Sequence, residues 1–163
     1  MALYGDYPVT PDDGETAMTL TRSGVFITSK GKDCIDGVVR EVRGERGILN
    51  VMGKEFHTIE RTSTMRLPVK VIECTMIDHS SKGKIFYPTA DGEYGHGKRT
   101  DKGTPGGILI HAASYPHHLS GCLAPGRIIL TTGIGESREA LDDIFIALGG
   151  FTVGRKVHLT VKN

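Results

Sequence analysis

The sequence predicts a mainly β (α+β) fold with one clear helix, at about residues 137–148. The length of 163 residues fits a single domain, since domains usually hold about 100–200 residues. The chain has 22 glycines and no tryptophan, and its apolar runs are short and bounded by glycine. These features favour a sheet with many turns over a helical bundle. We therefore expect one domain over residues 16–163, preceded by an extended arm at 1–15 that contains prolines and acidic residues.

Strand-like segments follow one another from residue 18. Alternation in TLTRS and GVFITSKG, with glycine at the boundary, predicts a hairpin over residues 19–31. Short β runs are expected after it, interrupted at Gly44, Gly47 and Gly53. The segment LPVKVIECTMID, residues 67–78, is the best candidate for a central strand.

The second half of the chain contains three further strand candidates and the helix. The strands are GILIH (107–111), RIILTT (127–132) and the C-terminal segment 151–163. Ser137 is expected to cap the helix and Gly149–Gly150 to end it. The spacing of the helix's apolar face places five side chains together: Ala140, Leu141, Ile144, Phe145 and Leu148.

Residues 79–107 are dense in glycine and basic side chains and are expected to form a long loop. Ordered loops longer than about 15 residues are uncommon and often act as lids or binding arms. Two interpretations remain open here. The segment is either a flexible surface excursion or a flap that uses Tyr94, His96, Lys98 and Arg99 to contact a partner.

Charge and cysteine content exclude several classes of protein. The net charge is +1, with 20 basic and 19 acidic side chains, so neither nucleic acid nor an anionic membrane is an expected partner. Cys34, Cys74 and Cys122 are an odd and widely spaced set, which argues against a disulfide framework. The first residues lack the basic and apolar regions of a signal peptide, and no apolar run spans a bilayer. The expectation is a protein made in the cytoplasm that stays soluble.

His111 and Cys122 form the pair that points to chemistry. A thiol becomes a nucleophile when a neighbouring imidazole stabilises its thiolate. His111 ends one predicted strand and Cys122 precedes the next, so their side chains can converge. Gly121 and Gly126 let the backbone turn tightly and present N–H groups, as an oxyanion hole requires.

Other interpretations of these residues stay open. A cysteine is often an inert small hydrophobic residue, which is our interpretation of Cys34 and Cys74. A zinc site is also conceivable, built from His111, Cys122 and one of the adjacent histidines His117 and His118. The remaining histidines are expected to be surface or satisfied core residues: His57, His79, His96 and His158.

The stretch ILIHAASYPHHLSGCLAPG, residues 108–126, resembles the core motif of a small phage and bacterial family of uncharacterised domains. That motif reads approximately I-L-I-H-x-G-N-x-P-x-D-T-x-G-C-I-L-x-G. The matching positions are 108–111, Pro116, Gly121, Cys122 and Gly126. Downstream, ESREALDDIF is similar to the family's helix after the motif, and upstream, TSTMRLPVKVIE loosely matches one of its strands.

The motif in turn resembles that of the YkuD-type L,D-transpeptidases, in which a histidine is followed by Ser/Thr-x-Gly-Cys. The resemblance implies a compact β-sandwich or barrel-like domain with a capping helix, and it implies no cofactor or metal. Cys122 would be the nucleophile, His111 its base, and Gly121 part of the turn. Ser120 lies one place later than the family's Ser/Thr, and Arg127 is the candidate for the cation that those enzymes carry after the cysteine.

Two functions follow from these expectations. The first is cysteine-dependent acyl transfer or hydrolysis on peptidoglycan stem peptides, by a protein encoded in a phage. The alternative is a non-catalytic virion or tail protein that retains the scaffold and assembles with other virion proteins or with itself. Self-association would use residues 1–15 and 79–107, because such segments often order only against a partner.

Overall fold

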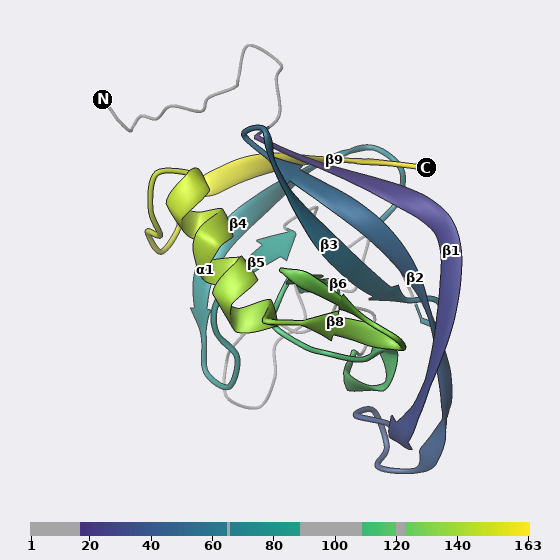
Figure 1. The fold of residues 1–163 in the computed structure, drawn as a ribbon. Coiled ribbons are helices and arrows are strands. Elements are labelled where there is room, and N and C mark those ends of the chain that lie inside the picture. Colours follow the sequence, from purple (N-terminus) through teal and green to yellow (C-terminus); the bar gives the residue numbers. More distant parts are fainter. Residues whose placement is uncertain (1–16, 65, 89–108, 120–122) are drawn as a thin grey trace.

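The computed structural model describes residues 17–64, 66–88, 109–119 and 123–163. The arm predicted at 1–15 and the part of the predicted loop from 89 to 107 lie outside these residues, as do Ser120, Gly121 and Cys122. Nine strands, a short 3-10 helix η1 and one α-helix are described (Figure 1). In chain order they are β1 (Met18–Lys32), β2 (Val39–Val51), β3 (Lys54–Arg61), β4 (Val71–His79), β5 (Gly83–Pro88), η1 (Pro116–His118), β6 (Leu123–Gly126), β7 (Ile128–Leu130), β8 (Gly133–Gly135), α1 (Ser137–Ala147) and β9 (Lys156–Lys162).

Seven strands form one mixed sheet in the order β5-β4-β9-β1-β2-β3-β6, and β7 and β8 form a separate pair. Among the described strands of this sheet, β1 and β9 are the only pair that runs parallel. The sheet curves strongly, and the described strands do not close into a barrel (Figure 1). The mainly β (α+β) prediction is confirmed, and so is the single helix, which ends one residue earlier than expected.

The segment that carries His111 lies between the two edge strands of this sheet. Ile110 pairs antiparallel with Phe86 of β5 and parallel with Leu123 of β6. Both backbone hydrogen bonds between Phe86 and Ile110 form, at 3.1 and 3.0 Å. This segment therefore satisfies backbone groups on both edges, which would otherwise be open to pairing with another chain.

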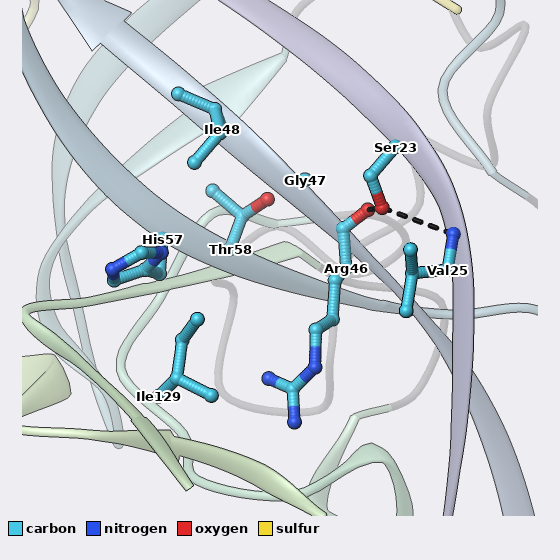
Figure 2. Close-up of a pocket in the computed structure, with 8 residues that line it drawn as sticks. All are labelled: Ser23, Val25, Arg46, Gly47, Ile48, His57, Thr58 and Ile129. Carbon is cyan, nitrogen blue, oxygen red and sulfur yellow. Dashed lines mark hydrogen bonds between the residues drawn. The ribbon is translucent and has the colours of Figure 1, made fainter.

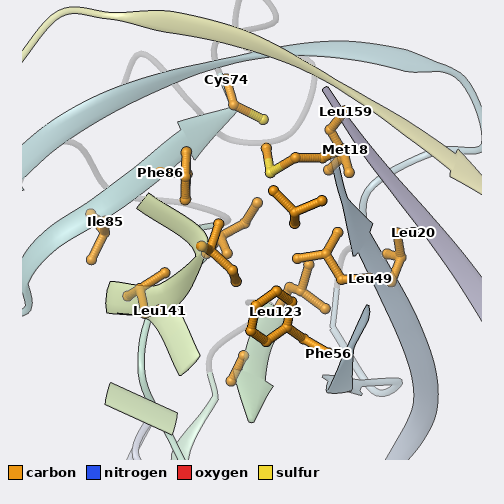
Figure 3. Packing of buried hydrophobic residues seen from close by; sticks show 14 of the residues in the cluster. Met18, Leu20, Leu49, Phe56, Cys74, Ile85, Phe86, Leu123, Leu141 and Leu159 are labelled. Carbon is orange, nitrogen blue, oxygen red and sulfur yellow. The ribbon is translucent and has the colours of Figure 1, made fainter. Parts of the chain in front are cut away.

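The core lies inside the curved sheet and is closed by α1 (Figure 3). Leu141 of α1 and Phe86 of β5 point toward Leu49 and Leu123, which are also fully buried. Phe86 and Phe145 stack with ring centroids 4.7 Å apart, so the apolar helix face predicted from the sequence packs over β5. Each such side chain contributes about 1.5–3 kcal/mol by leaving water.

Several strand boundaries differ from the prediction, and the glycines explain most of the differences. Residues 19–31 are not a hairpin but part of β1, whose register shifts at a bulge around Gly24 with φ +76°. Gly44 and Gly47 do not interrupt β2. Each lies so close to another side chain that a larger residue would not fit. A Cβ on Gly44 would lie 2.7 Å from Cγ of Pro116, and one on Gly47 would lie 2.8 Å from Oγ1 of Thr58. Gly53, at φ +89°, does make the predicted turn.

The predicted loop at 79–107 is wrong in its first part. β4 continues to His79, and residues 83–88 form β5, which pairs with β4 from Cys74↔Pro88 to His79↔Gly83. β4 itself confirms the strand predicted at 67–78, and it lies between β5 and β9. Among the described residues, no helix has the length and apolar character needed to cross a membrane.

Candidate functional site

The backbone of His111 is fixed beside the strand that begins immediately after Cys122. The N–H of His111 donates to the carbonyl of Leu123 at 3.1 Å, and the N–H of Leu123 donates to the carbonyl of Leu109 at 3.0 Å. Segment 109–111 and the start of β6 are therefore hydrogen-bonded neighbours.

The imidazole of His111 is buried, with 3% of the residue exposed. Its Nδ1 lies 2.9 Å from the carbonyl oxygen of Ala112. A carbonyl only accepts, so Nδ1 carries the proton and Nε2 holds the lone pair. This is the tautomer that a general base acting through Nε2 requires.

The environment of His111 keeps this ring neutral. Burial of the imidazole, followed by the positive charge of Lys82, lowers the pKa of His111 to about 4. The charges of His79 and Arg138 act in the same direction, and the hydrogen bond to Ala112 opposes them. The same positive charges would stabilise a thiolate beside the ring, since cationic neighbours lower the pKa of a cysteine.

Ser137 ties together the segments that surround His111. Its hydroxyl donates to the carbonyl of Pro125 in β6 and accepts from the N–H of Ala113 at 3.0 Å. The prediction that Ser137 caps the helix is wrong. The N-cap residue is Glu136, in a left-handed conformation with φ 54°, and no side chain caps the helix. Ser137 instead uses its hydroxyl to hold α1, β6 and residues 111–113 in one arrangement.

The chain is anchored just before residue 120 as well. Arg61 of β3 donates to the carbonyl of Leu119 at 2.9 Å, and it pairs with the fully buried carboxylate of Asp33 at 2.7 Å. His117 accepts or donates a 2.8 Å hydrogen bond between its Nδ1 and Oγ of Ser29. The described residues on both sides of 120–122 are thus held by contacts with the large sheet.

The other predicted residues are placed as follows. Cys74 is fully buried, and desolvation strongly raises its thiol pKa, which supports its interpretation as inert. Cys34 is exposed. Gly126 lies in the β3–β6 ladder opposite His57. Arg127 is engaged by Asp143, with Nε 2.8 Å from a carboxylate oxygen, and by Glu136.

The zinc interpretation gains no support from the described residues. Within them, no group of three or more histidine, cysteine, aspartate or glutamate side chains is arranged to hold a metal ion. His117 is 8% exposed, and its ring is bonded to Ser29.

Sequence reasoning missed Lys82, Arg138 and the linking role of Ser137. No local pattern marks these residues, because they come from the β4–β5 turn and the start of α1. Their proximity to His111 depends on the pairing of β5 with Ile110 and on the hydroxyl contact of Ser137.

A separate apolar pocket of about 190 Å³ lies between β1, β2, β3 and β7 (Figure 2). The guanidinium of Arg46 reaches past it to the carbonyls of Gly133, at 2.9 Å, and Thr131, at 3.2 Å, in the β7–β8 hairpin. His111 is not among the residues that line this pocket. These are Ser23, Val25, Arg46, Gly47, Ile48, His57, Thr58 and Ile129. Because the guanidinium of Arg46 is hydrogen-bonded to the β7–β8 hairpin, we interpret this pocket as a feature of packing between the strands. We take His111 as the centre of the candidate site.

No family model, curated protein or solved structure matches the chain.

Proposed function

We propose that the protein is a cysteine-dependent acyltransferase or hydrolase of the L,D-transpeptidase type that acts on peptidoglycan stem peptides, with Cys122 as nucleophile and His111 as base. The observation that carries the proposal is the buried His111, whose Nδ1 is bonded to Ala112 and whose backbone is bonded to Leu123. A histidine held in this tautomer, beside the strand that starts one residue after a cysteine, is suited to take a thiol proton.

Chain connectivity supports the reach between the two residues. Consecutive Cα atoms are about 3.8 Å apart, and neighbouring strands lie about 4.8 Å apart. Leu123 is paired with the His111 segment, and Cys122 is covalently joined to Leu123. The proposal requires only that the thiol turn toward Nε2 from this position.

The proposed reaction has two halves, both served by His111. In the first, the thiol proton passes to Nε2 and the thiolate attacks the carbonyl carbon of the scissile amide. The C–N bond then breaks, Nε2–H returns its proton to the leaving amine, and a thioester to Cys122 remains. In the second, an acceptor amine or water attacks the thioester, Nε2 takes its proton, and the sulfur leaves and is reprotonated.

The turn before the nucleophile has a supporting role in this proposal. Backbone N–H groups at Ser120 and Gly121 would stabilise the oxyanion of each tetrahedral intermediate, a contribution of about 3–4 kcal/mol for one donor in other acyl-transfer enzymes. The proposed setting is a phage virion that brings the protein to the cell wall.

Mass spectrometry with muropeptides tests the proposal directly. The wild-type chain is expected to gain the mass of an acyl group on Cys122, and Cys122→Ala is expected to gain none. Replacing Cys34 with alanine is the matched control, because it removes an exposed thiol that has no role in the proposed chemistry and should leave the adduct intact.

Alkylation provides a second test that needs no substrate. Iodoacetamide should label Cys122 much faster than Cys34 or Cys74, and His111→Gln should slow the labelling of Cys122 alone. Equally slow labelling of all three thiols, together with no acyl adduct, would overturn the proposal. The non-catalytic virion or tail role would then be the better explanation of the motif.

A further inference from the structure

Two cations near His111 form no ion pair with a carboxylate of the described residues. Lys82, in the turn after β4, is exposed and forms no ion pair with the described residues. Arg138, the second residue of α1, is half-buried, and its one hydrogen bond among these residues runs from Nη2 to the carbonyl of Lys84 at 3.3 Å. Arg22 and Arg61 of the large sheet, by contrast, are bonded to buried carboxylates.

Three contacts bring these cations to the same side of His111. Segment 109–113 runs antiparallel to β5 from the Ile110–Phe86 pair onward. It therefore approaches the β4–β5 turn, which contains Lys82. The hydrogen bond between Ala113 N–H and Ser137 places the start of α1 at the same point. Arg138 then extends over the turn, where its Nη1 lies 3.7 Å from the position of a Cβ on Gly83.

We propose that Lys82 and Arg138 form a carboxylate-binding subsite beside His111, so that the preferred acyl donor carries a free carboxylate close to its scissile amide. The inference rests on the proposed function and narrows its substrate class. A guanidinium presents paired N–H donors that match a carboxylate, and a lysine adds a mobile positive charge at the rim. The effect of both charges on the ring of His111 agrees with this placement.

The acidic side chains on the surrounding elements do not pair with Lys82 or Arg138 among the described residues, so both cations can bind a carboxylate of a substrate. Asp78 is exposed on β4 opposite Lys84, and Glu139 is exposed on the first turn of α1. Glu136 lies 3.4 Å from Arg127. None of the three forms an ion pair with Lys82 or Arg138 in the part of the chain that the structure describes.

The first test compares a charged and a neutral alkylating agent of the same size. Iodoacetate carries a carboxylate and iodoacetamide does not, so the ratio of their rates at Cys122 reports the local positive charge. The double variant Lys82→Gln/Arg138→Gln should lower the iodoacetate-to-iodoacetamide ratio about three- to tenfold, since 1.4 kcal/mol corresponds to a factor of ten. The control Lys30→Gln/Lys162→Gln removes the same net charge from exposed sites and should leave the ratio unchanged.

The second test does not depend on catalysis or on Cys122. Succinate, compared with sodium chloride at equal ionic strength, should raise the pKa of His111 followed by the NMR signal of its ring, because a bound anion favours the imidazolium. The double variant should abolish this response. A rate ratio and a histidine titration that are both unchanged by the double variant would overturn the subsite. Slow alkylation of Cys122 by both reagents, with the succinate response intact, would instead overturn the proposed function and leave an anion site at His111.

Discussion

Replacing Ser137 with alanine removes the hydroxyl that links three segments around His111. The substitution leaves the carbonyl of Pro125 without this donor and the N–H of Ala113 without its acceptor. A buried polar group left unpaired costs about 1–3 kcal/mol. Pro125 is buried, whereas Ala113 is half-buried and can bond to water instead. We therefore expect a loss of about 2 kcal/mol, close to the cost of one unpaired group.

Thermal and urea unfolding measure this loss. In a chain of this size, 2 kcal/mol corresponds to a decrease of about 4–8 °C in Tm. Asp142→Ala is the matched control, because it places an alanine on the same helix at an exposed position without a described partner. Hydrogen exchange should also show faster exchange of the Ala113 amide in Ser137→Ala and not in the control. Equal stability of the two variants, with an Ala113 amide that stays protected, would show that the Ser137 hydroxyl does not hold these segments together.

Three further predictions concern the contacts around the site. Asp33→Asn should cost about 3 kcal/mol in urea unfolding, because it leaves a buried guanidinium unpaired, whereas Asp36→Asn, with 43% of its side chain exposed, should be nearly neutral. Arg61 lowers the pKa of Asp33, so the stability that this carboxylate provides should be present above its unfolded pKa and lost as the pH falls below it. Gly31→Ala should displace the ring of His117, whose Nε2 a Cβ would overlap, and NMR should show that ring signal shifted. Burial lowers the pKa of His111 from 6.5 to about 4, so protonation of this ring in the unfolded chain should not reduce the free energy of unfolding above pH 6.5 and should reduce it as the pH falls toward 4. Over that range the free energy of unfolding of the wild type should fall by about 3 kcal/mol more than that of His111→Gln.

Local patterns predicted the fold class and the helix. Short apolar runs mark β4 and β9, and the spacing of Ala140, Leu141, Ile144 and Phe145 marks α1. The helix also ends where its glycines predicted: Gly149 and Gly150 both have positive φ, and their N–H groups bond to the carbonyls of Ile146 and Phe145. These features depend on neighbours within a few positions, so a single sequence is sufficient to find them.

The errors concern residues whose partners are distant in the chain. Gly44 suggests a break in a strand, yet it is a site of close packing against Pro116, more than seventy positions later. Ser137 has the chemistry of a helix cap, but its hydroxyl is used by Pro125 and Ala113. In the candidate site, His111 could be predicted because a local motif surrounds it. Lys82 and Arg138 could not, because only the long-range pairing of β5 brings their elements to it.

The backbone and the side chain have separate tasks in the segment that holds His111. The main chain of residues 109–111 bonds to Phe86 on one edge of the sheet and to Leu123 on the other. The ring bonds only to the adjacent Ala112 carbonyl among the described contacts. The same residues thus pair with both sheet edges and place the imidazole, but only the pairing depends on the main chain alone. A change of the imidazole should therefore leave the paired edges intact, which makes His111→Gln a test of the proposed chemistry, whereas a change at buried Phe86 would disturb both the edges and the position of His111.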